Sequence, residues 1–160
     1  MTETIAYEDA GRIGEVEIRK YPALHLATVQ GLAEDEAFGM LFQYISGNNK
    51  PGRAIPMTAP VVSDAASMSF VMPAGSTWEN IPEPLDSRVR IVMLPERDIA
   101  VIRFSGYAPQ EDVDAAASRL QEGLKSEGIG TAGQPFLMRY DSPWTPGFLR
   151  RNEVAIEIRR

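Results

Sequence analysis

The single histidine, His25, is the side chain with the broadest chemical use in this 160-residue sequence. Imidazole titrates near neutral pH and is the commonest protein metal ligand. Strand alternation places His25 on one face with Ala27 and Val29, opposite Leu24 and Leu26. A structural or surface role is therefore favoured over a role as ligand or general base, and the identity of any metal ligand stays open.

Glu153 is the second candidate. It lies in the stretch RRNEVAIEI, where it alternates with apolar residues along a predicted strand. A carboxylate that faces a cleft could bind a cation or act as a general base, and burial would raise its pKa. Pairing with arginine, or exposure to solvent, is the favoured alternative.

Neither residue belongs to a recognisable catalytic motif. The chain has no cysteine, which excludes thiolate metal sites and a cysteine nucleophile. No G-x-S-x-G elbow, phosphate-binding loop or dinucleotide fingerprint occurs. No catalytic residue is therefore assigned, and a binding protein is favoured over an enzyme.

Charge and hydropathy exclude several classes of partner. The formal net charge is -6, whereas a sequence-independent nucleic-acid binder needs a basic surface. The N-terminal stretch lacks a secretory signal, and no apolar run approaches the ~20 residues that span a bilayer. We expect a cytoplasmic protein without nucleic-acid or membrane partners, of undefined oligomeric state.

The hydrophobic pattern predicts strands and two helices around these residues. Residues 15–20 alternate as a half-buried strand, with Val16 and Ile18 on one face and Glu17 and Arg19 on the other. Helical periodicity with acids in the first turn predicts helices over 33–47 and 108–128. Further strands are predicted from the apolar runs at 23–31, 57–63, 67–73, 88–106, 135–144 and 152–160.

The order of these elements repeats. Two segments, VEIRKYPALHLATVQG and VRIVMLPERDIAVIRFSG, each give a strand, a proline bend and a strand that ends in glycine. Each precedes one helix and two strands, which predicts repeat halves of about 14–73 and 88–158 in a single domain, 1–160. We expect an α+β fold: a distorted eight-stranded open β-barrel from two pseudo-symmetric β-β-α-β-β units, with two helices.

Methionines and aromatics gather between residues 38 and 72, around the loop GNNKPGRAIPMTAP. Most are core residues, because Met and Phe at these spacings are ordinary packing residues. A subset beside the loop could line a pocket for a flat apolar ligand, with Lys50 or Arg53 reaching its acidic groups.

Five stretches carry a resemblance to a known family: YEDAGRIGEVEIRKYP, FGMLFQYISGNNKPGRAIPMTAPV, SFVMP, IRFSGYA and RYDSPWTPGFLRRNEVAIEI. In this order, from about Tyr7 to Ile158, they resemble the SOUL haem-binding protein family, which is related in fold to GyrI-like effector-binding domains. The most specific matches are IPMTAPV and YDSPWTPGFLRRNEV.

The resemblance implies non-covalent binding of haem or another tetrapyrrole on an apolar groove formed by the first helix and the following loop. Carried over residue by residue, this implies a site made by Leu41, Phe42, Ile45, Lys50, Arg53, Ile55 and Met57. The histidine proposed as axial ligand in some members precedes the first-strand tyrosine, and here that position is Lys20. Iron would then depend on Met57, Tyr44, Lys20, a nonaligned His25 or apolar contact.

A second reading uses a cleft between the two halves. Relatives with the GyrI-like fold include small-molecule sensors and hydrolases whose clefts hold aromatic residues and a glutamate. By residue type, Tyr140, Trp144 and Glu153 would be their counterparts. The alternative function is therefore a cytoplasmic sensor, carrier or small-molecule hydrolase.

Overall fold

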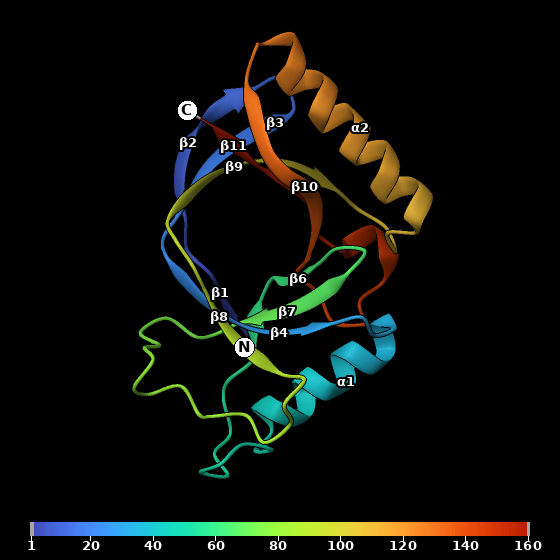
Figure 1. Ribbon diagram of the computed structural model, residues 1–160. Helices are drawn as coiled ribbons and strands as arrows, with labels where there is room; N and C mark the ends of the chain where they lie inside the picture. Colours follow the sequence, from blue (N-terminus) through green and yellow to red (C-terminus); the bar gives the residue numbers. More distant parts are fainter. Residues whose placement is uncertain (1, 160) are drawn as a thin grey trace. The chain divides into compact units, whose positions relative to one another are not determined.

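A computed structural model describes residues 2–159, which fall into two compact units. Unit 1 comprises Ala23–Pro95 together with the chain start as far as Ile5. Unit 2 comprises Ala6–Pro22 and the chain from Glu96 onwards. Each unit combines a helix with mainly antiparallel strands (Figure 1), so the predicted α+β class with two helices is confirmed.

Unit 1 places helix α1 against a curved antiparallel sheet. The sheet order is β6-β7-β4-β8, and a short parallel pair, β1-β5, accompanies it. The elements are β1 (Glu3–Thr4), β4 (Leu24–Gln30), α1 (Glu34–Ile45), β5 (Thr58–Ala59), β6 (Val61–Ser63), β7 (Ser67–Val71) and β8 (Arg90–Leu94).

Helix α1 forms where its periodicity predicts. Acidic residues occupy its first turn, where the helix dipole favours negative charge. Gly47 follows the last turn with a φ of 121°, a left-handed conformation that glycine adopts without strain. The buried stripe is the predicted one, Ala37, Leu41, Tyr44 and Ile45, and it packs on β4 and β7 residues Ala27, Val29, Met68 and Phe70.

Unit 2 has the strand order β2-β3-β9-β11-β10, all antiparallel, with α2 on one face. The apolar stripe of α2, Ala116, Leu120 and Leu124, packs on the inward residues of β3, β9 and β11. The elements are β2 (Glu8–Ile13), β3 (Val16–Tyr21), β9 (Arg97–Phe104), α2 (Gln110–Ser126), β10 (Gly130–Arg139), a 3₁₀ turn η1 (Gly147–Leu149) and β11 (Asn152–Arg159).

Two features of unit 2 differ from the sequence expectation. Strand β2 was not predicted, because its residues are exposed apart from the half-buried Ile13 and give no apolar alternation. Arg19 was expected on the polar face of a half-buried strand, yet its exposed fraction is 0%. The expectation was wrong because Tyr7 and Glu153 cover the second face of β3 at this point.

The two units do not coincide with the predicted repeat halves. Strand β3 comes from the first predicted half and belongs to unit 2, whereas β8 comes from the second and belongs to unit 1. Each unit therefore combines strands from both halves of the chain. The internal repeat itself stays a prediction.

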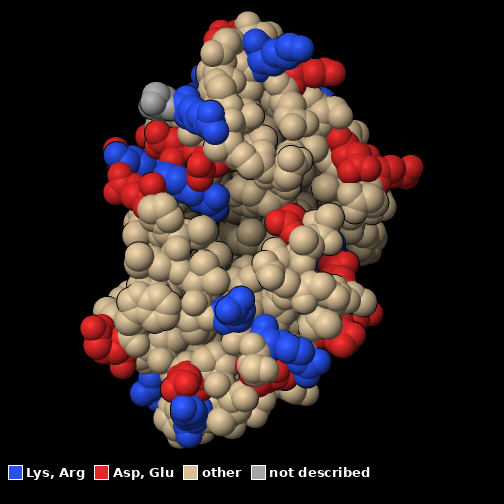
Figure 2. Space-filling model, in the orientation of Figure 1, with Lys and Arg blue, Asp and Glu red and all other residues tan. Residues whose placement is uncertain are grey.

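Within residues 2–159, neither helix combines the length and apolar character needed to cross a bilayer. On the face shown in Figure 2, acidic and basic side chains are interspersed rather than gathered by sign. This mixture gives that face no broad basic stripe of the kind that tracks a phosphate backbone.

Candidate functional site

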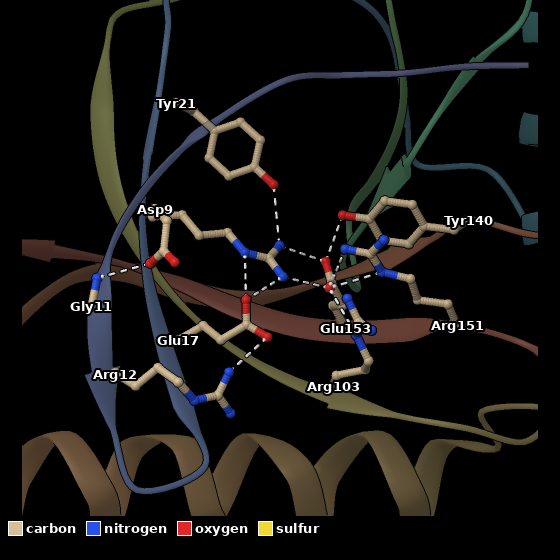
Figure 3. Close-up of polar contacts among 10 residues, drawn as sticks. Asp9, Gly11, Arg12, Glu17, Tyr21, Arg103, Tyr140, Arg151 and Glu153 are labelled. Carbon is tan, nitrogen blue, oxygen red and sulfur yellow. Dashed lines mark hydrogen bonds and ion pairs between the residues drawn. The ribbon is translucent and has the colours of Figure 1, made fainter.

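The sheet of unit 2 carries a buried polar cluster on the face opposite α2. Glu153 lies on β11, and its register partner on β9 is Arg103. The carboxylate is fully buried and accepts two hydrogen bonds of 2.7 Å from the Nη1 and Nη2 atoms of Arg19. Tyr140 donates its hydroxyl to Oε1, and Arg151 donates Nε and Nη2 to Oε2 at 3.1 and 3.0 Å. Figure 3 shows Tyr140 and Arg151 pointing toward Glu153.

Arg19 is held on its other sides as well. Glu17 accepts hydrogen bonds from Nε at 3.1 Å and from Nη2 at 2.9 Å, and the Tyr21 hydroxyl accepts one from Nη1 at 3.2 Å. The guanidinium carbon lies 4.3 Å from the centre of the Tyr7 ring, within cation-π range. We call Arg19, Glu153, Tyr140 and Arg151 the Glu153 cluster.

The cluster keeps Glu153 ionised. Burial alone would raise the pKa of its carboxyl, but hydrogen bonds from Arg19 and Tyr140 and the charges of Arg19 and Arg151 hold that pKa below its ordinary value. Burial and the negative charge of Glu153 raise the pKa of Tyr140, which stays a neutral donor. The raised pKa predicted for a buried Glu153 is therefore wrong, because arginine compensates its charge.

These contacts limit what Glu153 can do chemically. Both carboxylate oxygens already accept two hydrogen bonds or more, and the charge is balanced by a bidentate arginine. A general base needs a free lone pair and a pKa near the working pH. Of the three residues in the alternative site, the structure brings Tyr140 and Glu153 together, while Trp144 is 90% exposed on the following loop.

The apolar residues implied for a tetrapyrrole site divide into two sets. Leu41 and Ile45 are buried in the core of unit 1, and Ile55 and Met57 pack against that core, partly buried. Phe42 is different, because 50% of it is exposed on α1, with its ring stacked at 6.2 Å on that of Phe38. Phe42 is therefore accessible to a ligand at the surface, whereas Leu41 and Ile45 are enclosed in the core.

The two predicted cations lie in the loop after α1. Lys50 is exposed and pairs with Glu83 at 3.0 Å. Arg53 is also exposed, and its Nη2 donates to the carbonyl of Asn80 at 2.6 Å. Both contacts are on the surface, and the ion pair of Lys50 with Glu83 is of the exposed kind that contributes little to stability. Phe38, Phe42, Lys50 and Arg53 are called the α1 surface below.

Asn49 fixes the loop that carries these cations. Its exposed fraction is 2%, and its Nδ2 donates to the carbonyls of Tyr44 and Arg53 at 3.0 and 2.8 Å. Its Oδ1 accepts from the backbone N–H of Arg53 at 3.0 Å. One buried side chain thus ties the end of α1 to the position of Arg53.

We expect Asn49→Ala to lower the free energy of unfolding by about 2–3 kcal/mol, because three hydrogen bonds are lost at about 0.5–1.5 kcal/mol each. Urea unfolding followed by circular dichroism measures this change. Asn48→Ala is the matched control, since Asn48 is the exposed neighbour. Equal effects from both substitutions would contradict the role assigned to Asn49.

The residues considered as iron ligands are mostly engaged elsewhere. The Tyr44 hydroxyl donates to the carbonyl of Pro82 at 2.6 Å, and burial raises the pKa of this tyrosine to about 12. Lys20 pairs with Glu96 at 3.0 Å. Met57 is partly buried against the unit 1 core. Residues 2–159 hold no group of three or more His, Cys, Asp or Glu side chains arranged for a metal.

Sequence reasoning missed Arg19, Tyr21 and Arg151 as partners of Glu153. Arg19 and Glu153 are separated by 134 positions, and no local spacing joins them. The one available signal is that Glu17, Arg19 and Tyr21 share a strand face.

Comparison with known proteins agrees with the family inferred from the motifs. Residues 2–157 match the family described as "SOUL heme-binding protein". The chain is 28% identical to mouse "Heme-binding protein 1" over 171 aligned residues, covering 95% of this chain and 84% of that protein. It is 34% identical to human "Heme-binding protein 2" over 139 residues, covering 73% and 67%.

Among solved structures, the EcmrR C-terminal domain is similar in fold, with a TM-score of 0.69 at 12% identity, covering 98% of this chain and 99% of that one. At this identity the likeness concerns the fold alone. The family match extends over nearly the whole sequence. The chain therefore belongs to the SOUL haem-binding protein family.

Proposed function

We propose that this protein binds haem or a related tetrapyrrole non-covalently, on the α1 surface. Membership of the SOUL family and the haem-binding names of its mouse and human relatives support the choice of ligand. The observation that carries the location is the exposed Phe42, stacked on Phe38 and followed by two exposed cations.

The chemistry of these four side chains suits a porphyrin. A flat aromatic macrocycle stacks favourably on a phenyl ring, with a gain of about 0.5–1.5 kcal/mol beyond buried area. Lys50 and Arg53 supply charge for the propionates, and each can exchange its present surface partner for a ligand carboxylate. Leu41 and Ile45 contribute indirectly, because their packing in the core holds the helix that carries Phe42.

Haem would supply a redox-active iron with an axial position for a ligand atom. The position implied for the axial histidine is Lys20. The hydrogen bond and charge of Glu96 raise the pKa of this lysine, and its ammonium has no lone pair to give to iron, so the residue does not fit that role. The proposal therefore rests on stacking and charge, and assigns no axial ligand on the α1 surface.

A hemin titration followed at the Soret band tests the proposal. We expect saturable binding to the wild type and a roughly 10-fold weaker affinity for Phe42→Ala, which corresponds to about 1.4 kcal/mol. Trp144→Ala is the matched control, because Trp144 is an even more exposed aromatic, 90% against 50%, on another loop.

Each outcome of the titration has a distinct meaning. Absence of a saturable spectral change in the wild type would rule out haem binding itself. Weaker binding by Trp144→Ala with unchanged Phe42→Ala would keep haem as ligand and move the site to the loop at 141–150. A change abolished only by His25→Ala would identify that histidine as the iron ligand and overturn the location.

A further inference from the structure

One histidine and two methionines lie side by side in the sheet of unit 1, His25 on β4, Met93 on β8 and Met72 directly after the end of β7. His25 on β4 is the register partner of Met93 on β8. On the other side, the N–H of Met72 donates to the carbonyl of His25 at 2.8 Å, which continues the β4–β7 register one residue beyond Leu26 and Val71. Residues opposite one another in antiparallel strands project to the same face. We call His25, Met72 and Met93 the thioether row.

The row lies at the edge of the face covered by α1. His25 lies on the same strand face as Ala27 and Val29, and Met72 belongs to the same core at 4% exposure. Met93 is 53% exposed. The row therefore joins one buried and one solvent-accessible thioether on either side of an imidazole.

The imidazole has an unused ring nitrogen. Nε2 of His25 is buried and has no hydrogen-bond partner among the described residues. Leaving such a group unsatisfied costs about 1–3 kcal/mol, so the position is unfavourable unless something occupies it. The indole of Trp78 packs edge to face on this ring, with centroids 5.4 Å apart at 87°.

These ligand types select a soft ion of low charge. Thioethers favour Cu(I), while carboxylates and water favour Mg²⁺ and Ca²⁺. Two thioethers and one neutral imidazole add no negative charge, which suits a monovalent better than a divalent cation.

The side chains of Met72 and Met93 are long enough to bind the same ion as His25. Directly opposite residues in antiparallel strands have Cβ atoms about 4.5–5.5 Å apart, and methionine has three rotatable bonds with which to direct its sulfur. The backbone of His25 is held in strand β4, and its ring packs against Trp78. Both methionine sulfur atoms can therefore reach an ion that is bound by the imidazole nitrogen.

We propose that His25, Met72 and Met93 form a Cu(I)-binding site of one imidazole and two thioethers, with Trp78 beside it. The site is independent of the tetrapyrrole surface and uses none of its residues. Because the chain has no cysteine and a single histidine, no thiolate or second imidazole competes for the ion.

The test is an anaerobic titration of the full chain with Cu(I), in competition with a chromophoric Cu(I) chelator. We expect one equivalent to bind, and Met93→Leu to weaken the affinity at least 10-fold. Ag(I), a redox-silent substitute, should shift the ring ¹⁵N resonances of His25, which are unambiguous because no other histidine exists. In a Trp144→Phe background the only remaining indole, Trp78, should report binding by its fluorescence.

Met68→Leu is the matched control, because Met68 lies on β7 four residues before Met72, on the same face, but opposite Val29. It should leave Cu(I) affinity unchanged. Met93 is exposed, so Met93→Leu remains informative even where His25→Gln or Met72→Leu impairs folding. Wild-type affinity in both Met93→Leu and His25→Gln, or no binding by the wild type in competition with the chelator, would overturn the proposal. Since hemin is absent, neither result bears on tetrapyrrole binding.

Discussion

Replacing Glu153 by glutamine should lower the free energy of unfolding by about 3 kcal/mol. Removing one partner of a buried ion pair typically costs 3–5 kcal/mol, because the other charge is left uncompensated. The lower figure applies here, since Glu17 still holds Arg19 at 2.9 Å. Thermal unfolding should show the loss as a fall in Tm of roughly 6–12 °C.

Glu157→Gln is the matched control for this substitution. Glu157 lies on the same strand, but its side chain is 38% exposed and its partner Arg97 is 3.7 Å away. Exposed pairs contribute about 0–1 kcal/mol, so its Tm should change little. If the two variants had equal stability, the Glu153 cluster would not be a stabilising centre.

Acid titration gives a second readout of the same charge. Because the folded pKa of Glu153 lies below its ordinary value of 4.5, the group stabilises the fold above that pH. This contribution is lost as the pH falls through the lower, folded pKa. The stability of the wild type should therefore decrease more steeply below about pH 4.5 than that of Glu153→Gln, which has no such group to titrate.

Leu41→Ala should be the second large effect, lowering the free energy of unfolding by about 2–5 kcal/mol. Leu41 is 0% exposed and packs in the core between α1 and the sheet of unit 1. Truncating it leaves a cavity and removes apolar contacts, which urea unfolding measures directly. Phe42→Ala, at the next position but half exposed, should change stability by less than about 1 kcal/mol.

Of the two substitutions on α1, only Phe42→Ala should weaken hemin binding. Phe42→Ala should lose affinity while staying folded, and Leu41→Ala should keep its affinity at temperatures where it remains folded. A folded Leu41→Ala protein with lost hemin affinity, next to an unaffected Phe42→Ala protein, would mean that the ligand enters the core and not the α1 surface.

The sequence predicted the elements better than the roles of their polar residues. The stripe Ala37, Leu41, Tyr44 and Ile45 followed from helical periodicity alone, since apolar residues at that spacing share one face. For Glu153, exposure to solvent or pairing with arginine was favoured; the structure shows pairing, with an arginine that the sequence did not identify. Alternation assigned Arg19 to the polar face of β3, and could not reveal that Tyr7 and Glu153 cover that face.

The same limit applies to the site residues. Family motifs pointed to Leu41, Phe42 and Ile45 together, because a motif records which residues recur and not which of them are exposed. Exposure depends on which side of α1 packs against β4 and β7. Of the three residues, only Phe42 remains half exposed.

By itself, the sequence determined the family, the α+β class, the two helices and the absence of thiol chemistry, since these depend on motifs, local periodicity and composition. Tertiary structure decided that Glu153 meets Arg19 across 134 positions, that Asn49 ties the loop after α1, and that His25 lies between Met72 and Met93. Each of these depends on strand register and on the covering of a sheet face. Contacts between distant segments arise only when the sheets assemble, so no local pattern can encode them.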